Sequence, residues 1–268
     1  LVAGDTNGYS DIFVRDLLTG QTERISVASD GSQGNGDSGS PYELVSLSAD
    51  GTRVAFASMA SNLVAGDTNV CPTLFYNSGP CPDVFVRDRT DGTTERVSVS
   101  TTGTQTTIDP IDYFKAPAIS GDGRIVVFAS SDTTLAAGAT NGYTQILAHD
   151  RTTHETSLVS ASTYRWQGNS WSHCPPDIST TGRYVSFNSL ASDLVPDDGN
   201  GFADIFVRDR EGWTYAMDGT VRNAEGDPMA GVLVGYGTGV GEWKETDTNG
   251  EYQLYYMPTG TYAIHAVL

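Results

Sequence analysis

Short apolar stretches recur along the chain with the spacing of β-strands. In three of them a valine and a phenylalanine stand two positions apart, at Val54/Phe56, Val126/Phe128 and Val185/Phe187. A spacing of two places both side chains on one face of an extended strand. No stretch of about a dozen residues has the spacing of an amphipathic helix. The pattern therefore predicts an all-β protein.

The strand pattern belongs to an internal repeat. Three segments align closely: "LSADGTRVAFAS" from Leu47, "ISGDGRIVVFAS" from Ile119 and "ISTTGRYVSFNS" from Ile178, each followed by a loop and an "F-V-R-D"-like strand. The opening "LVAGDTNGYSDIFVRDLLTGQTERISVAS" is the second half of the same unit. One unit therefore predicts four strands, with a tight turn at Asp50-Gly51, Asp122-Gly123 or Thr181-Gly182 between the first two.

Residues 1–212 resemble the WD40-like, TolB-type β-propeller repeat found in many bacterial secreted proteins, through the "S-x-DG-R-x-V-x-F-x-S" hairpin and the "D-x-F-V-R-D-x-x-T-G" strand. The resemblance implies four-stranded antiparallel blades around a channel. The chain supplies strands three and four of one blade, two complete blades, and strands one to three of another. We therefore expect a propeller that is incomplete at both ends, either as a piece of a longer precursor or completed by neighbouring copies.

Residues 213–268 follow a different pattern and predict a second, small domain. Their matched positions are Gly219-x-Val221, Pro228-x-x-Gly231-Val232, Thr246-Asp247-x-x-Gly250-x-Tyr252 and Pro258-x-Gly260-x-Tyr262. This signature resembles the carboxypeptidase regulatory-like domain, a transthyretin-like β-sandwich. The resemblance implies an accessory or adhesion module in which Val221, Val232, Tyr252 and Tyr262 face the core.

The charge balance restricts the partners. The 268 residues carry 15 basic and 33 acidic side chains, a formal net charge of −18. Such a surface repels phosphate backbones and anionic membranes, which argues against nucleic-acid binding. No run is apolar enough to span a bilayer, so membrane insertion is not expected. The composition is typical of a protein outside the cell, and we expect an extracellular or cell-surface location in a bacterium.

The cysteines support an oxidising compartment. Cys71 and Cys81 bracket the insertion "CPTLFYNSGPC", which predicts a local disulfide. Metal binding by this pair is the weaker interpretation, because no nearby residues complete four ligands. Cys174 is left over and is expected to be a small buried residue.

A recurring loop, Asp-x-Asn-Gly before the third strand, suggests calcium. In the first copy Asp5, Asn7, the carbonyl of Tyr9 and Asp11 could supply oxygens on a short flexible loop, which is the ligand type that Ca²⁺ prefers. The equivalent candidates are Asp67, Asn69 and Asp83 in the second copy, and Asp198, Asn200 and Asp204, with Asp197 beside them, in the last. The third copy has Ala139 and Gln145 at the acidic positions, as a discarded ion site would. The alternative is that these residues only make Asx-turns.

Catalytic signals are lacking. The "V-R-D" strand ends recur at Arg15-Asp16, Arg87-Asp88 and Arg208-Asp209, which favours a structural role in capping a turn or bridging blades. The four histidines are scattered, and no nucleophile-elbow, phosphate-loop or dinucleotide motif occurs. Tyr164, Trp166, Trp171 and Trp213 could line a glycan-binding surface, although such residues more often pack between blades.

These observations predict a non-catalytic, calcium-stabilised structural or adhesive scaffold that self-associates head to tail into a homo-oligomer or filament. A glycan- or peptide-binding module is the second hypothesis. The third is an accessory propeller of a larger secreted enzyme whose active residues lie outside this chain.

Overall fold

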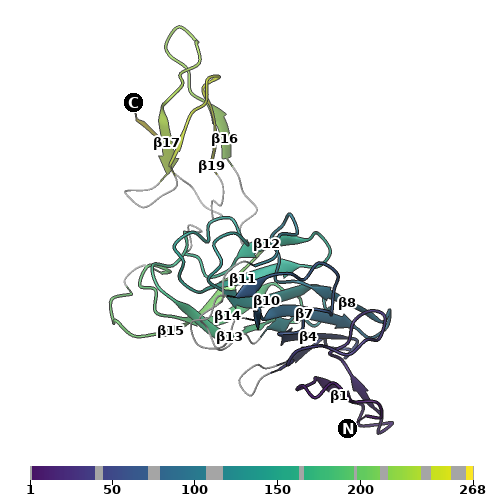
Figure 1. Cartoon of the computed structure of the whole chain (residues 1–268). Coiled ribbons are helices and arrows are strands. Elements are labelled where there is room, and N and C mark those ends of the chain that lie inside the picture. The colour runs from purple at the N-terminus through teal and green to yellow at the C-terminus, as the bar shows by residue number, and fades with distance from the viewer. Residues whose placement is uncertain are drawn as a thin grey trace. The chain divides into compact units, whose positions relative to one another are not determined.

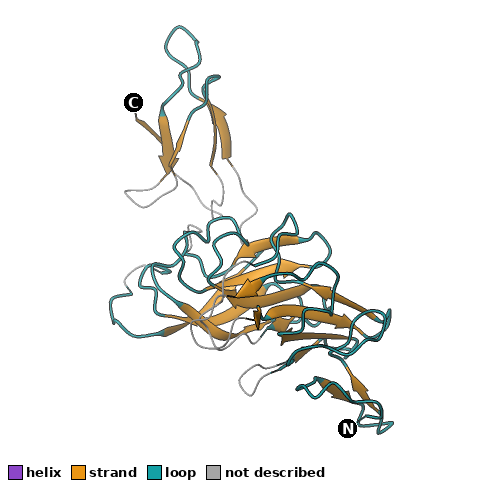
Figure 2. Ribbon diagram, viewed as in Figure 1, coloured by secondary structure: helices purple, strands orange, loops and turns teal. Residues whose placement is uncertain are grey.

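The computed structural model describes residues 2–39, 45–71, 79–106, 117–162, 166–195, 198–211, 217–236, 243–254 and 264–267. All regular elements in these ranges are strands, as the alternation predicts (Figure 2). The chain divides into two compact units, one formed by Leu1–Ser162 with Trp166–Asp209 and the other by Thr163–Arg165 with Arg210–Leu268. The domain boundary predicted at residue 212 lies outside the described residues.

The second blade of the first unit is a four-stranded antiparallel sheet in the order β3-β4-β7-β8 (Figure 1). Its strands are β3 (Ser46–Leu47), β4 (Arg53–Ser58), β7 (Asp83–Asp88) and β8 (Thr93–Arg96). The register pairs Phe56 with Phe85 across β4 and β7. The insertion between these strands begins and ends with a small ladder of β5 (Val70–Cys71) and β6 (Gly79–Pro80).

The third blade repeats this arrangement in the order β12-β11-β10-β9. Its strands are β9 (Ala118–Ile119), β10 (Ile125–Ser130), β11 (Gln145–Asp150) and β12 (Glu155–Leu158). The predicted hairpin turns are confirmed, because Gly51 and Gly123 both have positive φ, at 67° and 72°. A residue with a β-carbon is strained in that conformation, which explains the Asp-Gly pairs.

The outer blades have fewer strands among the described residues. The first blade is the hairpin of β1 (Phe13–Arg15) and β2 (Thr22–Arg24). The last blade is the sheet β13-β14-β15, formed by β13 (Ser172–Ile178), β14 (Tyr184–Ser189) and β15 (Asp204–Asp209). The predicted order of a half blade, two full blades and a three-stranded blade is therefore found.

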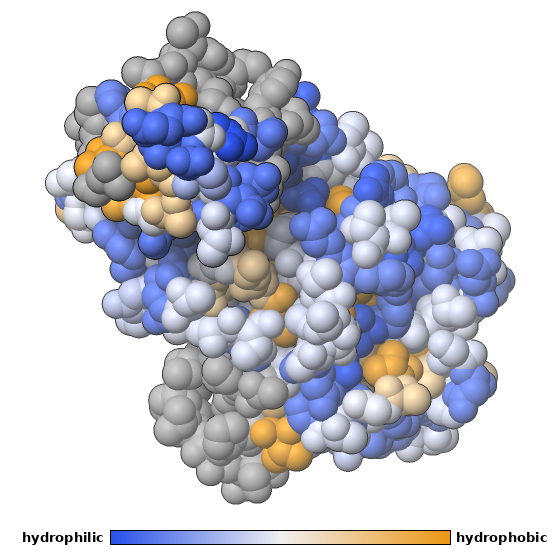
Figure 3. All heavy atoms as spheres, turned by 90° about the horizontal axis from the view of Figure 1, so that it is seen from above, coloured by the Kyte–Doolittle hydropathy of each residue, from blue (hydrophilic) through white to orange (hydrophobic). Residues whose placement is uncertain are grey.

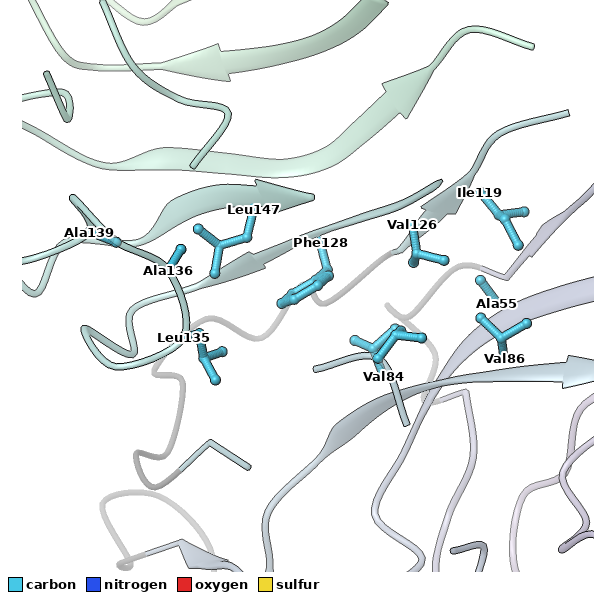
Figure 4. Packing of buried hydrophobic residues seen from close by; sticks show 11 residues of the cluster. Ala55, Val84, Val86, Ile119, Val126, Phe128, Leu135, Ala136, Ala139 and Leu147 are labelled. Atoms are coloured by element: carbon cyan, nitrogen blue, oxygen red, sulfur yellow. The ribbon is translucent and has the colours of Figure 1, made fainter. Parts of the chain in front are cut away.

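Apolar side chains fill the spaces between successive blades. One cluster joins Val84 and Val86 of the second blade to Val126 and Phe128 of the third (Figure 4). A second joins Ile146 and Ala148 of the third blade to Val185 and Phe187 of the last, and a third joins Ile12 and Ile25 to Val54 and Phe56. Alternation along each strand thus sends one face to the preceding blade and the other to the following blade.

The second unit contains two small antiparallel sheets. One pairs β16 (Met217–Thr220) with β19 (Glu251–Leu254), and the other has the order β18-β17-β20, with β17 (Leu233–Tyr236), β18 (Trp243–Glu245) and β20 (Ile264–Val267). Of the predicted core positions, Val232 is buried, Val221 and Tyr252 are half-buried, and Tyr262 lies outside the described residues. The assignment to a carboxypeptidase regulatory-like sandwich stays a prediction.

Hydrophilic residues cover most of the described surface on the face that Figure 3 shows, and apolar residues appear there in small separate groups. Among the described residues, no helix is long and apolar enough to cross a membrane.

Candidate functional site

The recurring Asp-x-Asn-Gly loop connects the second and third strands of a blade, and the last acidic residue of the motif lies at the start of the third strand. Asp83 begins β7 and Asp204 begins β15. The first acidic residue of each motif lies in the loop itself. The described structure shows what occupies the space between the two carboxylates in each copy.

In the first copy an arginine lies between the two predicted calcium ligands. Arg24, at the end of β2, places Nη1 3.4 Å from Oδ1 of Asp5 and 3.3 Å from Oδ2 of Asp11. The side chain of Arg24 is only 8% exposed and that of Asp11 is 1% exposed. The guanidinium also donates to the carbonyl of Gly4 and to Oε1 of Gln33. The fourth strand therefore supplies a buried cation to this loop.

The second copy has the same arrangement. Nη1 of Arg96, at the end of β8, lies 3.0 Å from Oδ1 of Asp67 and 3.5 Å from Oδ2 of Asp83. All three side chains are 10% exposed or less. Burial, and after it the charge of Asp83, raise the pKa of Asp67, Arg96 opposes both effects, and the resulting pKa is about 6. One guanidinium thus forms ion pairs with two carboxylates.

In the third copy the acidic pair and the arginine are replaced together. Ala139 and Gln145 stand at the acidic positions, and Leu158 stands where Arg24 and Arg96 lie. Leu158 packs against the apolar cluster that contains Ala139. Oε1 of Gln145 accepts a hydrogen bond from the hydroxyl of Ser160. A neutral, partly apolar set occupies the place of a buried ion triad.

This geometry bears on the predicted calcium ligands Asp5, Asp11, Asp67 and Asp83. Their oxygens face an arginine of the same blade, so a calcium ion would have to displace that guanidinium. Within the described ranges, no group of three or more His, Cys, Asp or Glu residues could hold a metal ion. The donor sets of the first two copies fit a guanidinium better than an ion, and calcium binding stays a prediction.

The asparagine of the motif makes the Asx-turn that was the alternative interpretation. Oδ1 of Asn7 accepts the N–H of Tyr9, and Oδ1 of Asn141 accepts that of Tyr143. The amide groups of Asn7 and Asn141 donate across the blade to the carbonyls of Gly34 and Gly168. The turn forms equally in the third copy, which lacks both acidic residues, so the turn does not need a charged site.

A glutamine after the fourth strand holds the loop in the first three blades, and the sequence interpretation missed it. Oε1 of Gln33 accepts the N–H groups of Thr6 and Asn7, and Oε1 of Gln167 accepts those of Thr140 and Asn141. In the second blade Gln105 bonds Thr68 in the same way. The regular recurrence of this glutamine after each "S-x-S/A-x" strand end was the available signal.

The insertion in the second copy changes the turn. Cys71 stands two residues after Asn69, at the start of the insertion. Oδ1 of Asn69 is buried and has no hydrogen-bond partner among the described residues. Cys81 is disulfide-bonded. The side chain of Cys71 lies outside the described residues, so the predicted Cys71–Cys81 pairing stays a prediction, and the same holds for the burial of Cys174.

The last copy keeps the motif without the arginine. Nδ2 of Asn200 donates to Oδ2 of Asp204 at 2.8 Å, and Oδ1 of Asn200 accepts the N–H of Phe202. Among the described residues, no cationic side chain lies within ion-pair distance of Asp198 or Asp204. Asp197, the additional candidate, lies outside the described residues.

The structural interpretation of the "V-R-D" strand ends is confirmed. Oδ1 of Asp88 accepts the N–H groups of Thr90 and Asp91 in the turn to β8. Arg87 donates to the carbonyl of Ala28 in the preceding blade, and Arg208 donates to that of Ser162. The aspartate caps the turn and the arginine bridges two blades.

The aromatic candidates for glycan contact are only partly brought together. Trp166 and Trp171 are exposed, and the ring of Trp171 lies 5.9 Å edge-on from that of Tyr143 and 6.3 Å from that of His173. Tyr164 and Trp213 lie outside the described residues.

The sheets and their recurring contacts define an all-β repeat protein with four-stranded antiparallel sheets, which is consistent with propeller blades. Among the described residues, closure of a propeller is not detected. No protein-family model matches the chain, and no curated protein matches it.

Solved structures give distant matches to propeller proteins. TolB from Acinetobacter baumannii matches with 15% identity and a TM-score of 0.37, over 95% of this chain and 50% of its own length. Dipeptidyl peptidase 4 from Porphyromonas gingivalis matches with 13% identity and a TM-score of 0.42, over 91% of this chain and 36% of its own. The propeller domain of the Trilobed protease from Pyrococcus furiosus matches with 8% identity and a TM-score of 0.32, over 80% of this chain and 56% of its own. The chain thus spans about half the length of the A. baumannii TolB, and likeness at this level carries no argument about activity.

Proposed function

We propose that the chain is a non-catalytic structural or adhesive scaffold of the bacterial cell surface, whose TolB-type blades join head to tail with those of other copies. One observation carries the proposal. Ile205 and Val207, on the outer side of β15, are 75% and 68% exposed. The equivalent residues Val84 and Val86 in β7 are fully buried. The last blade therefore keeps the apolar strand of a blade interface with its side chains exposed.

Inner blades show how this side is normally covered. Val84 and Val86 pack against Val126 and Phe128 of the next blade (Figure 4). Ile146 and Ala148 in turn lie in one cluster with residues of the last blade. Since each inner blade is covered by a following blade of the same repeat, a further blade is the natural occupant beside Ile205 and Val207. Contiguous exposed apolar surface is typical of docking sites, and Ile205 and Val207 lie on one face of the same strand.

The first blade presents the opposite side of such an interface. In the second blade Arg87 donates to the carbonyl of Ala28, and Arg89 forms an ion pair with Glu23, so both residues reach back to the preceding blade. The equivalent residues of the first blade are Arg15 and Leu17, and both are exposed. One chain thus carries both halves of a heterologous contact, which produces a ring or a filament when copies associate.

The outer side of the last blade is less apolar than an inner interface. Ser186 and Asn188 of β14 pair with Val207 and Ile205 and share their face. The third blade has Val127 and Ala129 at these positions. A face that mixes apolar and polar positions is typical of contacts between separately folded partners rather than of a permanent core.

The remaining parts of the proposal rest on the composition and on the second unit. The net charge of −18 favours a surface in contact with the extracellular medium. The second unit, with its resemblance to a carboxypeptidase regulatory-like sandwich, would connect or anchor the blades. Calcium is the alternative occupant of the loop of the last copy, where no arginine of the described residues faces the two carboxylates, and the peptide-binding experiment below separates it from a guanidinium.

Sedimentation velocity over a concentration series, with electron microscopy of the particles, tests the assembly. The wild-type chain should form oligomers or fibres, and the double variant Ile205→Asp/Val207→Asp should sediment as a monomer. Met59→Asp, which changes an exposed apolar residue in a loop of the second blade, is the matched control and should assemble like the wild type. A wild-type monomer at all concentrations, or unchanged assembly of the double variant, would contradict the proposal.

A glycan-binding role is the second candidate, and the exposed pair of Trp171 and Tyr143 favours it. It predicts saturable binding of an oligosaccharide that is lost in Trp171→Ala and retained in Met59→Asp.

A further inference from the structure

The edge of β15 differs from the equivalent edges of the inner blades. β7 pairs with β4 on one side and β8 on the other, and β11 pairs with β10 and β12. Among the described residues, the segment of β15 from Asp204 to Val207 pairs with β14 alone. An unpaired strand edge is a template for the addition of another strand. In each of the first three blades a fourth strand occupies the corresponding edge, and its contacts show which strand would fit here.

The backbone contact is identical in the first three blades. The N–H of Ile25 donates to the carbonyl of Ile12, that of Val97 to Val84, and that of Val159 to Ile146, each at 2.8 Å. The donor residue is buried in every case. The equivalent acceptor in the last blade is the carbonyl of Ile205. A partner strand would therefore place a buried isoleucine or valine opposite Ile205.

The next residue of the fourth strand is a serine with two fixed contacts. Oγ of Ser98 accepts the N–H of Val84 and donates to Oδ1 of Asp83. Ser26 makes the same contacts with Ile12 and Asp11, and Ser160 with Ile146 and Gln145. In the last blade the corresponding groups are the N–H of Ile205 and the carboxylate of Asp204.

The residue before the buried isoleucine or valine determines the charge of the contact. It is Arg24 or Arg96 where the loop has two aspartates, and Leu158 where the loop has Ala139 and Gln145. The last blade has Asp198 and Asp204, which is the pattern that accompanies arginine. The same acidic pair holds a guanidinium in both other copies that have it.

We propose that the edge of β15 beside Asp204 and Ile205 binds an extended segment of sequence Arg-Ile/Val-Ser, with the guanidinium between the carboxylates of Asp198 and Asp204. The occupant is a strand with the chemistry of this repeat's own fourth strand, chosen by charge complementarity and by two backbone contacts at Ile205. The site lies on the edge of the sheet and not on the face that carries the side chains of Ile205 and Val207. It therefore holds or fails independently of head-to-tail assembly.

Peptide binding tests the site. The probe is a fluorescent peptide with the sequence of residues 23–29, "ERISVAS", and its control is the same peptide with Arg24→Leu. Fluorescence anisotropy is measured at protein concentrations too low for assembly. The wild-type chain should bind the arginine peptide at least about tenfold more tightly than the leucine peptide, because a charge-assisted hydrogen-bond pair is lost in the control.

The second part of the test is a protein variant whose last loop carries the residues of the third blade. Asp198→Ala/Asp204→Gln gives the last loop the residues of Ala139 and Gln145, and circular dichroism checks that it folds. This variant should lose the preference for arginine and bind the leucine peptide at least as well. Equal binding of the two peptides by the wild type, no binding of either, or an unchanged preference in the variant would overturn the proposal. Calcium binding to the wild type that is lost in the variant, with no preference for the arginine peptide, would identify an ion site and would also overturn it.

Discussion

The guanidinium of Arg96 lies 3.0 Å from the carboxylate of Asp67, and both side chains are buried. The same arginine reaches Asp83 at 3.5 Å, so two buried carboxylates share one cation. In the neighbouring blade the three positions are Leu158, Ala139 and Gln145. An ion triad and a neutral set thus occupy equivalent places in one molecule. Removing one member of a buried triad leaves an uncompensated charge, whereas replacing all members by packed neutral residues can be close to neutral.

Arg96→Leu alone should therefore destabilise the chain by about 3–5 kcal/mol, which is typical for a broken buried ion pair. The triple variant Arg96→Leu/Asp67→Ala/Asp83→Gln, which copies the third blade, should recover most of this loss. Urea denaturation measures the free energies of unfolding. A triple variant as unstable as the single one would show that the two sets are not interchangeable.

The pH dependence of stability should reveal the burial of Asp67. Burial and the nearby Asp83 raise its pKa from 3.8 to about 6, against the opposing effect of Arg96. Between these values the folded chain keeps a proton that the unfolded chain has released, so stability from this group is present below about pH 4 and lost as pH rises to about 6. The wild type should lose stability relative to Asp67→Asn over this range in urea denaturation. A constant difference between the two proteins would contradict the raised pKa.

The stability that Asp150 contributes should depend on pH in the opposite direction. Burial raises its pKa, but hydrogen bonds from Arg124 and from the N–H groups of Thr152 and Thr153 outweigh this and lower it to about 2. Its stabilising contribution is present above the unfolded value of 3.8 and is lost as pH falls through about 2. Relative to Asp150→Asn, the wild type should therefore lose stability on acidification. Thermal unfolding at a series of acidic pH values provides the measurement.

The bridge made by Arg87 should tolerate histidine better than alanine. Arg87 donates to the carbonyl of Ala28 and to Oγ1 of Thr94, and it is buried. In the third blade His149 stands at this position and its Nδ1 lies 2.8 Å from Oγ1 of Thr156, the equivalent of Thr94. Arg87→Ala should cost about 1.5–3 kcal/mol, in the range of hydrogen bonds to charged groups. Arg87→His should cost clearly less, and equal losses in thermal unfolding would argue against a shared role.

The glutamine that holds each loop should control local opening. Oε1 of Gln167 accepts the N–H groups of Thr140 and Asn141. A loss of about 1 kcal/mol per hydrogen bond corresponds to several-fold faster amide exchange at these residues in Gln167→Ala. Hydrogen exchange measured by mass spectrometry gives the rate, and Gln21→Ala, which changes an exposed turn residue, should leave it unchanged.

The local alternation of apolar and polar residues was sufficient to predict the strands. Alternation at Val126 and Phe128 predicted β10, because burial of one face depends only on a spacing of two. The turns at Gly51 and Gly123 were predicted because positive φ is a property of the residue itself. The structural role of Arg87-Asp88 followed from its recurrence in blades that have no site in common.

The occupant of the Asp-x-Asn-Gly loop was not predictable in the same way. The acidic residues suggested a metal ion, because carboxylates close together need a cation and the loop itself contains none. Arg24 and Arg96 lie beyond the third strand, and only the pairing of the third and fourth strands brings them between the carboxylates.

By itself the sequence determined an all-β chain of repeated four-stranded units, because strand period and turn chemistry are local properties. The tertiary structure decided which charges meet, which glutamine holds each loop, and which apolar strand remains exposed at Ile205 and Val207. These features depend on which strand lies beside which. Val84 and Ile205, each preceded by Asp and followed by Phe-Val-Arg-Asp, therefore differ completely in burial, because Val84 packs against the following blade and, among the described residues, Ile205 has no such neighbour.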